Sequence, residues 1–365
     1  MRVKLDSYAI SDRIALPPKA DYGIGIIGCG GIVNYAHLPA YKAHGLNVVA
    51  CYDPSHAAAE KTAHAHGIAH VAASLAELLA DEQVQIVDIA VPPWHQPAIA
   101  AQAINAGKHL LCQKPLANSY AAAAQIVTLA HAAGVKLAVN QQMRWDAGIH
   151  VARQLIEQGA LGQPTDARIQ VNVQTPWDLW PWIRENARIE IMFHSIHYLD
   201  SLRYLFGEPA RVSSFHTKYP GQLAVGETKT ITVLEYASGL QVLVDANHAN
   251  WSDDVSAIFR FLGTSGLIKG TLGLMYDYPR GRADTLEYQA NAEPRTWHAA
   301  SLNTMWIPDA FIGPIAGLIT AIQTGGEPPT SGADNLKTLQ IVYAAYRSAA
   351  EHRAVEPAEI VSEER

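Results

Sequence analysis

The chain has 365 residues, of which 49% are hydrophobic and 17% are charged, and its formal net charge is −7 at pH 7. This composition is typical of a globular protein with a large core, and the length favours two domains. Because basic residues do not cluster and no long apolar run is free of charges, the sequence predicts neither a nucleic-acid surface nor a membrane span.

Residues 1–20 are predicted to form an extension that leads into the first strand. They include several charges and a Pro17-Pro18 pair, and they lack the apolar stretch of a signal peptide. Whether the extension packs on a partner subunit is left open by the sequence. Cys29, Cys51 and Cys112 are few and lack zinc-site spacing, so we expect small buried side chains, no disulfides and a cytoplasmic location.

A Rossmann domain is predicted over residues 21–141, where short apolar runs alternate with alanine-rich helical stretches. Runs that are apolar on both faces predict parallel strands covered by helices, which together form a doubly wound sheet. The predicted strands are Tyr22–Ile27, Val48–Tyr52, Ile86–Val91, His109–Cys112 and Lys136–Val139. The predicted helices are Ile32–Ala43, Ser55–His66, Leu75–Ala80, Gln96–Ala106 and Tyr120–Ala133. Their expected caps are serines before the helices and glycines after them, namely Ser55, Ser74, Ser119, Gly45, Gly67, Gly107 and Gly134.

A second α/β domain is predicted over residues 142–365. Its strand-like runs are separated by short turns such as Ser238-Gly239, so its sheet is expected to be open, mixed and largely antiparallel. The predicted strands are Ala167–Gln174, Arg211–Thr217, Thr228–Tyr236, Leu240–Ala246 and Ala257–Leu262. The predicted helices are Ile149–Gln158, Ile191–Leu205, Ala310–Gln323 and Asn335–Glu351. An open sheet with one uncovered face favours association, so a homodimer or homotetramer is expected.

A glycine turn between the first strand and the first helix is the predicted cofactor site. Its residues are Gly28, Cys29, Gly30, Gly31, Ile32 and Val33. Gly28 permits a tight turn, Gly30 lets the backbone approach a pyrophosphate, and the helix N-terminus favours negative charge. Asp53 ends the second strand, where its carboxylate can bind the adenosine ribose and repel a 2′-phosphate, so NAD is predicted rather than NADP. The alternative is a glycine turn with a capping aspartate and no ligand.

Four later segments carry a resemblance to a known family. They are Val91–His95, Ala106–Ala117, Asn140–Trp145 and His197–Gly207. A Lys-Pro pair after a Gly-Lys-His strand, with His-x-x-Asp downstream, resembles the glucose–fructose oxidoreductase / inositol dehydrogenase / MocA family over nearly the whole chain. The resemblance implies a Rossmann domain followed by an open-sheet α/β domain. It also implies NAD-linked hydride transfer, with a sugar, polyol or related carbonyl compound as substrate.

The same resemblance implies roles for individual residues. Lys114 matches the active-site lysine of the family, His197 its acid/base histidine, and Asp200 the acid three residues later. Lys114 and His197 are therefore expected to act on the same substrate carbon. The residues that match the lining of the cofactor cleft are Pro92, His95, Gln113 and Lys114.

Two positions depart from the family pattern. Gln113 stands where a glutamate usually precedes the lysine, and Phe193 stands where an aspartate usually precedes the histidine by four residues. A neighbouring carboxylate normally raises the pKa of a histidine and orients its ring. Either another group, such as His194, fills that role, or the chemistry depends more on Lys114.

The aromatic loop after residue 174 is the predicted substrate-binding segment. Trp177, Trp180 and Trp182 can stack on the C–H faces of a sugar, or they can seal a subunit interface. His194 and His197 have a spacing that can bind a metal, but without an evident third ligand we expect no metal site. Further candidates, which can line the pocket or form ordinary surface contacts, are Arg144, Trp145, Arg184, Arg188, Trp306 and Asp309.

These residues together predict an NAD-dependent dehydrogenase or reductase that acts on the CH–OH groups of a carbohydrate or cyclitol. Two alternatives stay open. The first is a sugar lyase or glycosidase that oxidises its substrate transiently, with no net redox change. The second is a catalytically impaired nucleotide-binding sensor, which Phe193 and Gln113 suggest.

Overall fold

The computed structural model describes residues 8–361, and the described chain forms two compact units. The Rossmann unit consists of residues 14–142 and 307–337 together with Val361, and the mixed-sheet unit consists of residues 8–13, 143–306 and 338–360. Residues 307–337, which the sequence placed in the second domain, return to the first unit. Residues 1–7 of the predicted N-terminal extension lie outside the described residues.

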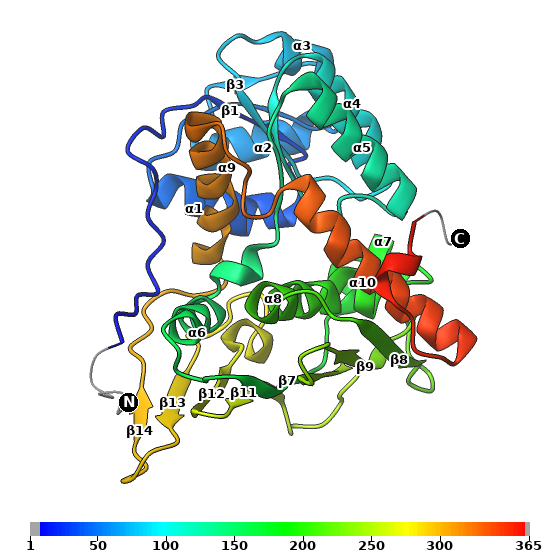
Figure 1. The fold of residues 1–365 in the computed structure, drawn as a ribbon. Coiled ribbons are helices and arrows are strands. Elements are labelled where there is room, and N and C mark those ends of the chain that lie inside the picture. Colours follow the sequence, from blue (N-terminus) through cyan, green and yellow to red (C-terminus); the bar gives the residue numbers. More distant parts are fainter. Residues whose placement is uncertain (1–7, 362–365) are drawn as a thin grey trace. The chain divides into compact units, whose positions relative to one another are not determined.

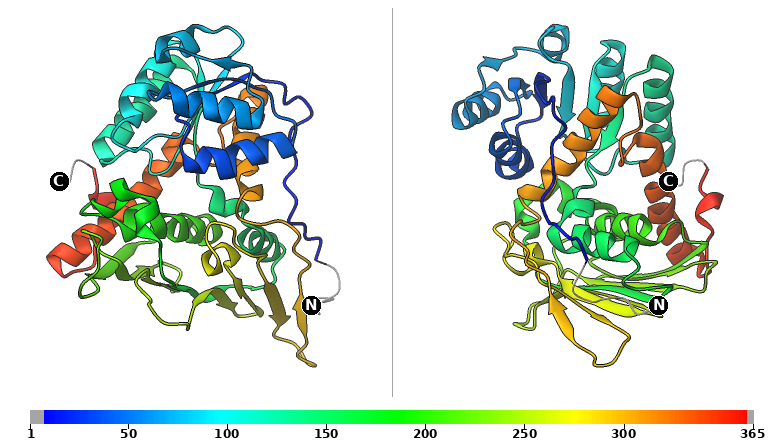
Figure 2. Two further views of the ribbon diagram at one scale, coloured as in Figure 1. Left: turned by 180° about the vertical axis from the view of Figure 1, so that it is seen from behind. Right: turned by 60° about the vertical axis from the view of Figure 1, so that its left-hand side comes forward.

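The Rossmann unit is built on a parallel sheet of six strands in the order β3-β2-β1-β4-β5-β6. Helices α1 and α2 lie on one face of this sheet, and α4 and α5 lie on the other (Figures 1 and 2). The strands are β1 (Ile24–Ile27), β2 (Val48–Tyr52), β3 (His70–Val71), β4 (Ile86–Ile89), β5 (His109–Cys112) and β6 (Leu137–Val139). The helices are α1 (Leu38–Ala43), α2 (His56–His66), α3 (Leu75–Ala80), α4 (Gln96–Asn105), α5 (Tyr120–Ala133) and α9 (Ile312–Thr324). Doubly wound architecture is therefore confirmed for this unit.

Local signals set the ends of these helices. The side chains of Ser55, Ser74 and Ser119 accept hydrogen bonds from the first turns of α2, α3 and α5, as predicted. Gly67 and Gly134 end α2 and α5 in the left-handed conformation, which glycine adopts without steric strain. The first helix differs from its prediction, because residues 33–37 form a π-helical turn before α1 begins.

The return of residues 307–337 to the Rossmann unit has a visible cause. The backbone N–H of Val139 on β6 donates to the carbonyl of Thr330 at 2.8 Å, and Ala138 pairs with Ser331 in an antiparallel bridge. This segment therefore satisfies the edge of β6, which would otherwise expose unpaired backbone groups. Such pairing joins residues almost 200 positions apart, so no local pattern in the sequence signals it.

The mixed-sheet unit contains eight strands in the order β14-β13-β12-β11-β7-β10-β9-β8, antiparallel except for the pair β7–β10. The open, largely antiparallel sheet is therefore confirmed, although β12, β13 and β14 were not predicted. The strands are β7 (Pro164–Asn172), β8 (Arg211–Thr217), β9 (Lys229–Glu235), β10 (Gln241–Asn247), β11 (Ser256–Gly263), β12 (Gly266–Thr271), β13 (Leu286–Ala290) and β14 (Trp297–Ala299). The helices are α6 (Ala147–Glu157), α7 (Pro181–Arg184), α8 (Ile196–Phe206) and α10 (Gly332–Glu351), whose first turns belong to the Rossmann unit.

One face of the mixed sheet is covered and the other is open. Helices α6 and α8 lie along one face, and the described part of this unit places no helix on the opposite face (Figure 1). Burial alternates along the strands, as expected for a sheet with one core face. The open face presents Phe215, Ile231 and Ile258 from β8, β9 and β11.

The described start of the chain packs on its own α6. Gln154 and Gln158 lie one helical turn apart, and each side-chain amide both accepts from and donates to the extended backbone, at Ser11 and Ala9 respectively. The two glutamine amides thus satisfy backbone N–H and C=O groups of this segment, as the backbone of a neighbouring strand would. Among residues 8–361, no helix combines the length and the apolar character that crossing a membrane requires.

Candidate active site

The glycine turn follows β1 as predicted. Gly28 has a φ of 95°, and a Cβ atom there would lie 2.5 Å from the carbonyl oxygen of Ala90, so only glycine fits without rearrangement. At Gly30 a Cβ would meet nothing within 4 Å, which means that open space lies above the turn. Gly30 and Gly31 are exposed, whereas Val33 is buried. The turn is therefore shaped to let backbone approach a pyrophosphate.

Asp53 lies beside this turn. One carboxylate oxygen accepts from the backbone N–H of Cys29 at 2.9 Å, and the other accepts from the N–H of Ser55 at 2.8 Å. Asn34, which the sequence analysis missed, donates from its amide to the carbonyls of Cys29 and Gly30. Asp53 thus braces the glycine turn, and its half-buried carboxylate retains lone pairs for a ribose hydroxyl.

Lys114 lies in a turn that follows β5, at the same carboxyl edge of the sheet as the glycine turn after β1. The Lys114–Pro115 peptide bond is cis. The buried amide of Gln96, at the start of α4, donates to the carbonyls of Gln113 at 2.9 Å and Pro115 at 2.8 Å and so brackets the turn. Desolvation by burial lowers the pKa of Lys114 to about 7. A lysine in this state exchanges a proton near neutral pH.

Two other predicted cofactor residues, Pro92 and His95, lie in the turn after β4, beside the same edge. His95 is exposed and stands at the N-terminus of α4, and Pro92 is half-buried. Beneath this edge lies a buried polar cluster that the sequence analysis missed, in which Asp88 accepts hydrogen bonds from His37 and Tyr41, both at 2.7 Å. The signal was present: an aspartate inside a strand that is otherwise apolar on both faces requires a buried partner.

In the mixed-sheet unit, His194 and His197 lie on consecutive turns, His194 in a π-helical turn (residues 191–195) and His197 in α8. The ring of His197 meets Trp306 edge-on with centroids 5.5 Å apart, and that of His194 lies 4.4 Å from His248. Trp177 packs edge-on against His194 at 5.2 Å. Because Trp177 is buried, it holds His194 in place and does not offer a free face to a sugar.

A buried acid, Glu190, lies beside His248, the ring that packs against His194. The side chains of Ser195 and Thr230 donate to Glu190, and His248 Nε2 lies 3.5 Å from the Glu190 carboxyl. Burial raises the pKa of Glu190 to about 8 and lowers that of His248 to about 3. Burial thus disfavours the charged form of both side chains.

Asp200 and Arg144 form a buried ion pair in the mixed-sheet unit. The guanidinium donates to both carboxylate oxygens at 2.7 Å, and Thr338 Oγ1 donates to the same carboxylate at 2.6 Å. Asp200 is 1% exposed and Arg144 is 3% exposed. These contacts give Asp200 a structural role and leave little room for the substrate contact that the sequence suggested. Arg144, a candidate pocket residue, is likewise held in this ion pair.

Of the remaining candidates, the two arginines are also engaged within this unit. Arg184 pairs with Asp178 at 2.7 Å, and Arg188 lies over the rings of Tyr343 and Tyr346. The arginines therefore give no support to an acidic or phosphorylated substrate. Three of the candidate tryptophans are half-buried or partly exposed, namely Trp145, Trp180 and Trp182. Asp309 lies in the Rossmann unit, just before α9.

Comparison with known proteins agrees with this geometry. Residues 22–141 match the family described as "Oxidoreductase family, NAD-binding Rossmann fold", and residues 149–269 match the "GFO/IDH/MocA C-terminal domain". A D-apiose dehydrogenase from Paraburkholderia graminis is 32% identical over 91% of this chain and 88% of its own length. The chain belongs to the GFO/IDH/MocA oxidoreductase family.

Two further relatives of this GFO/IDH/MocA protein span nearly all of it. A 1,5-anhydro-D-fructose reductase from Ensifer adhaerens is 28% identical over 91% of this chain and 97% of its own length. The crystal structure of an oxidoreductase from Agrobacterium radiobacter in complex with NAD+, L-tartaric acid and magnesium superposes with a TM-score of 0.83 at 26% identity. That comparison covers 93% of this chain and 100% of the other. The family and its two-domain fold, which the sequence motifs predicted, are confirmed.

The two departures from the family motif have different surroundings in this GFO/IDH/MocA oxidoreductase. Phe193 is buried and packs edge-on against Trp182 with centroids 5.5 Å apart, so an apolar contact fills the position. Gln113 keeps a polar role, since its Oε1 accepts from the backbone N–H of Lys114 at 2.8 Å. The substitution at 113 therefore preserves a hydrogen bond and removes a charge.

A buried carboxyl pair at the start of α6 leads to a prediction on stability. Burial and the neighbouring Asp284 carboxylate raise the pKa of Asp146 well above its usual range. The folded protein therefore retains a proton that the unfolded chain has lost, and stability falls as the pH rises from the unfolded pKa towards the folded one, by up to ~1.4 kcal/mol per pH unit. We expect Asp146→Asn, whose amide replaces that proton, to gain stability relative to the wild type as the pH rises.

Urea unfolding of the two proteins at acidic and at mildly alkaline pH measures this difference. Asp284→Asn is the matched control. Asp284 accepts from the backbone N–H groups of Gly148 and Gly273, so its amide variant should be destabilised at both pH values. Equal pH dependence of unfolding in wild type and Asp146→Asn would contradict the retention of a proton by Asp146 in the folded protein.

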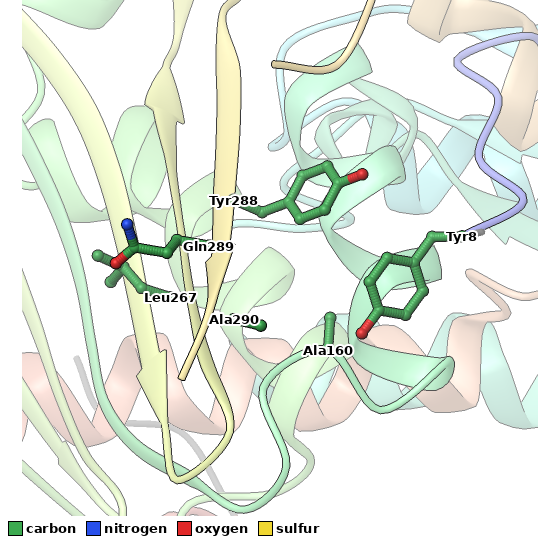
Figure 3. A pocket seen from close by; sticks show the side chains of 6 residues that line it. All are labelled: Tyr8, Ala160, Leu267, Tyr288, Gln289 and Ala290. Atoms are coloured by element: carbon green, nitrogen blue, oxygen red, sulfur yellow. The ribbon is translucent and has the colours of Figure 1, made fainter. Parts of the chain in front are cut away.

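A small hollow elsewhere in the mixed-sheet unit carries no chemistry. Figure 3 shows Tyr8 and Tyr288 beside it, with ring centroids 5.8 Å apart. It leaves essentially no space for even a water molecule, whereas typical ligand sites measure ~300–1,000 Å³. None of its lining residues is charged; they are Tyr8, Ala160, Leu267, Tyr288, Gln289 and Ala290.

Proposed function

We propose that this oxidoreductase interconverts a hydroxyl and a carbonyl group on a sugar, polyol or cyclitol, with NAD(H) as its redox partner. The observation that carries the proposal is the Lys114 turn. It places an amine whose pKa is lowered to about 7 on the sheet edge that also bears an open glycine turn. The names of the relatives, a D-apiose dehydrogenase and a 1,5-anhydro-D-fructose reductase, support a carbohydrate as substrate.

In this proposal the chain's own residues bind the cofactor and move a proton. Gly28 and Gly30 admit the pyrophosphate, and Asp53 binds the ribose hydroxyls. The bound nicotinamide supplies the acceptor or donor of the hydride. In the oxidative direction Lys114 Nζ takes the proton from the substrate hydroxyl, and in the reductive direction it returns that proton to the carbonyl oxygen. His197 is proposed as the second group that holds the substrate oxygen.

The direct test is a panel of sugars and polyols, including D-apiose and 1,5-anhydro-D-fructose, incubated with the purified protein and NAD+ or NADH. We expect the NADH absorbance to change with at least one substrate. A modified sugar formed without net NADH would support transient oxidation instead. Tight NAD binding with neither outcome across the panel would contradict the proposal and favour a sensor.

We further propose that NAD is used in preference to NADP. The carboxylate of Asp53 would lie against a 2′-phosphate, and like charges repel. Asp53→Asn is expected to raise the ratio of kcat/KM with NADP to kcat/KM with NAD by at least about tenfold, equivalent to ~1.4 kcal/mol. Asn retains an oxygen for the N–H of Cys29 but loses the bond from the N–H of Ser55. Because both cofactors use the same turn, the ratio isolates the effect of the charge. An unchanged ratio would show that Asp53 does not select the cofactor.

Association and location belong to the same proposal. The open face of the mixed sheet exposes Phe215 at 64% and Ile231 and Ile258 at 38% each, and we propose that a second copy of the chain covers it. Sedimentation velocity decides this, since a monomer at micromolar concentration would contradict it. Three buried cysteines without a disulfide fit a reducing cytoplasm, which fractionation of the source cells would test.

A further inference from the structure

A chain of hydrogen bonds runs beneath the Lys114 turn within the Rossmann unit. The backbone N–H of Lys114 donates to Gln113 Oε1 at 2.8 Å, and Gln113 Nε2 lies 3.3 Å from His37 Nε2. On the other side of the ring, His37 Nδ1 lies 2.7 Å from Asp88 Oδ2. His37 and Asp88 are both 0% exposed, so bulk water does not compete for these bonds.

The direction of each bond in this chain can be worked out. A backbone N–H can only donate, so the amide of Gln113 must present its oxygen to Lys114 and its nitrogen to His37. The amide nitrogen of Asn140 also approaches His37 Nε2, at 3.1 Å. Two donors on one ring nitrogen require that this nitrogen carries no proton. His37 is therefore the neutral imidazole protonated at Nδ1, and it donates to Asp88.

We propose that His37 is a positioning residue for the reaction: its fixed tautomer, set by Asp88, orients the Gln113 amide that holds the backbone of the Lys114 turn. This inference rests on the proposed role of Lys114 in proton transfer. Tyr41 strengthens the arrangement, because its hydroxyl donates to the same oxygen of Asp88 at 2.7 Å. The ring of Phe311 closes the other side of His37, with centroids 5.0 Å apart.

The glutamine at position 113 decides whether the His37 ring in this chain of hydrogen bonds is neutral or charged. An ionised glutamate there would offer only acceptors, so His37 Nε2 would have to donate, with the Asn140 amide turned to present its oxygen, while Nδ1 still donates to Asp88. Such a ring would be an imidazolium between two carboxylates. If it lost a proton, it could no longer donate a hydrogen bond to both of them. The titratable groups that face the His37–Asp88 pair are Tyr41 on α1 and Cys112 on β5, and burial raises the pKa of both. Neither of these two groups ionises near neutral pH, so neither adds a charge beside the His37–Asp88 pair there.

The tautomer can be observed without any enzyme assay. Proton–nitrogen correlation spectra of the protein labelled with ¹⁵N-histidine distinguish the two neutral tautomers and the imidazolium, and the His37 signals are those missing from His37→Gln. In the wild type we expect the signals of a neutral ring protonated at Nδ1, as the hydrogen bonds to Asp88 and Gln113 require. In Gln113→Glu the same signals should become those of an imidazolium at neutral pH. An Nε2-protonated ring in the wild type, or no change in Gln113→Glu, would overturn the proposal.

A matched pair of substitutions tests the effect on turnover. In His37→Gln an amide oxygen reaches the position of Nε2 and can accept from Gln113, whereas in His37→Asn an amide nitrogen reaches only the position of Nδ1. We expect kcat to be about tenfold lower in His37→Asn than in His37→Gln, with similar NAD affinity in both, as one lost hydrogen bond implies. Equal kcat values in two folded variants would overturn the proposal.

The two readouts separate this inference from the proposed function. If Lys114→Ala leaves turnover unchanged, the role of the lysine is refuted, even if the His37 tautomer is as expected. If Lys114→Ala abolishes turnover but the tautomer or the His37 pair behaves otherwise, only the positioning role of His37 is refuted. Should His37→Asn fail to fold, the spectra of the wild type and of Gln113→Glu still test the proposed tautomer of His37.

Discussion

Replacing Lys114 with alanine is expected to lower kcat by about 10²- to 10⁴-fold, the range that a general acid or base contributes. Lys114→Arg should lose as much activity, because a guanidinium keeps the positive charge but cannot release its proton near neutral pH. NAD affinity, measured by the quenching of protein fluorescence, should change far less than kcat. The matched control is Lys61→Ala, which removes an exposed lysine from α2 of the same unit.

The pH dependence of the wild type follows from the same residue. Only the neutral amine can accept a proton, and burial lowers the pKa of Lys114 to about 7. For the oxidation of an alcohol, kcat/KM should therefore rise as the pH passes about 7 and then level off. In the reductive direction the protonated amine is the active form, so the profile should fall over the same interval. A Lys114→Arg variant with near wild-type turnover, or a profile that is flat in both directions, would refute the assignment.

The elements that the sequence predicted well are those with strong local signals. Strands β2 and β5 and helices α3 and α5 have the bounds that apolar runs and serine caps indicated. Strands β3 and β14 have two and three residues, too few for a periodic pattern to emerge. Strands β12 and β13 pair through long-range contacts, and β12 contains two glycines, which sequence propensity reads as turns.

The site was predicted less completely, for a physical reason. Family motifs mark residues that we propose meet the cofactor or substrate, such as Gly28 and Lys114, but they do not mark the groups that hold those residues. Gln96 hydrogen-bonds to the Lys114 turn at Gln113, 17 residues away in the sequence, and His37 contacts the Gln113 amide, 76 residues away. Such supports become visible only when the parallel strands bring the loops together at one edge.

Asp200 has buried partners that its motif did not indicate. The sequence suggested an acid that contacts substrate or histidine, whereas the structure pairs it with Arg144, 56 residues away. We expect Asp200→Asn to destabilise the protein by about 3–5 kcal/mol, because it leaves the Arg144 guanidinium buried without a counter-charge. Urea unfolding measures this loss, and the kcat of the folded fraction should fall by less than about tenfold, far less than for Lys114→Ala.

A double-mutant cycle identifies the cause of that loss. Arg144→Met removes the cation and keeps an unbranched apolar side chain in its place, while Thr338 still finds an acceptor in the amide of Asn at position 200. We therefore expect Arg144→Met combined with Asp200→Asn to be more stable than Asp200→Asn alone, with a coupling energy of about 1–3 kcal/mol. Additive losses would mean that the pair contributes little. A loss of turnover as large as that of Lys114→Ala, without any loss of stability, would return Asp200 to the reaction itself.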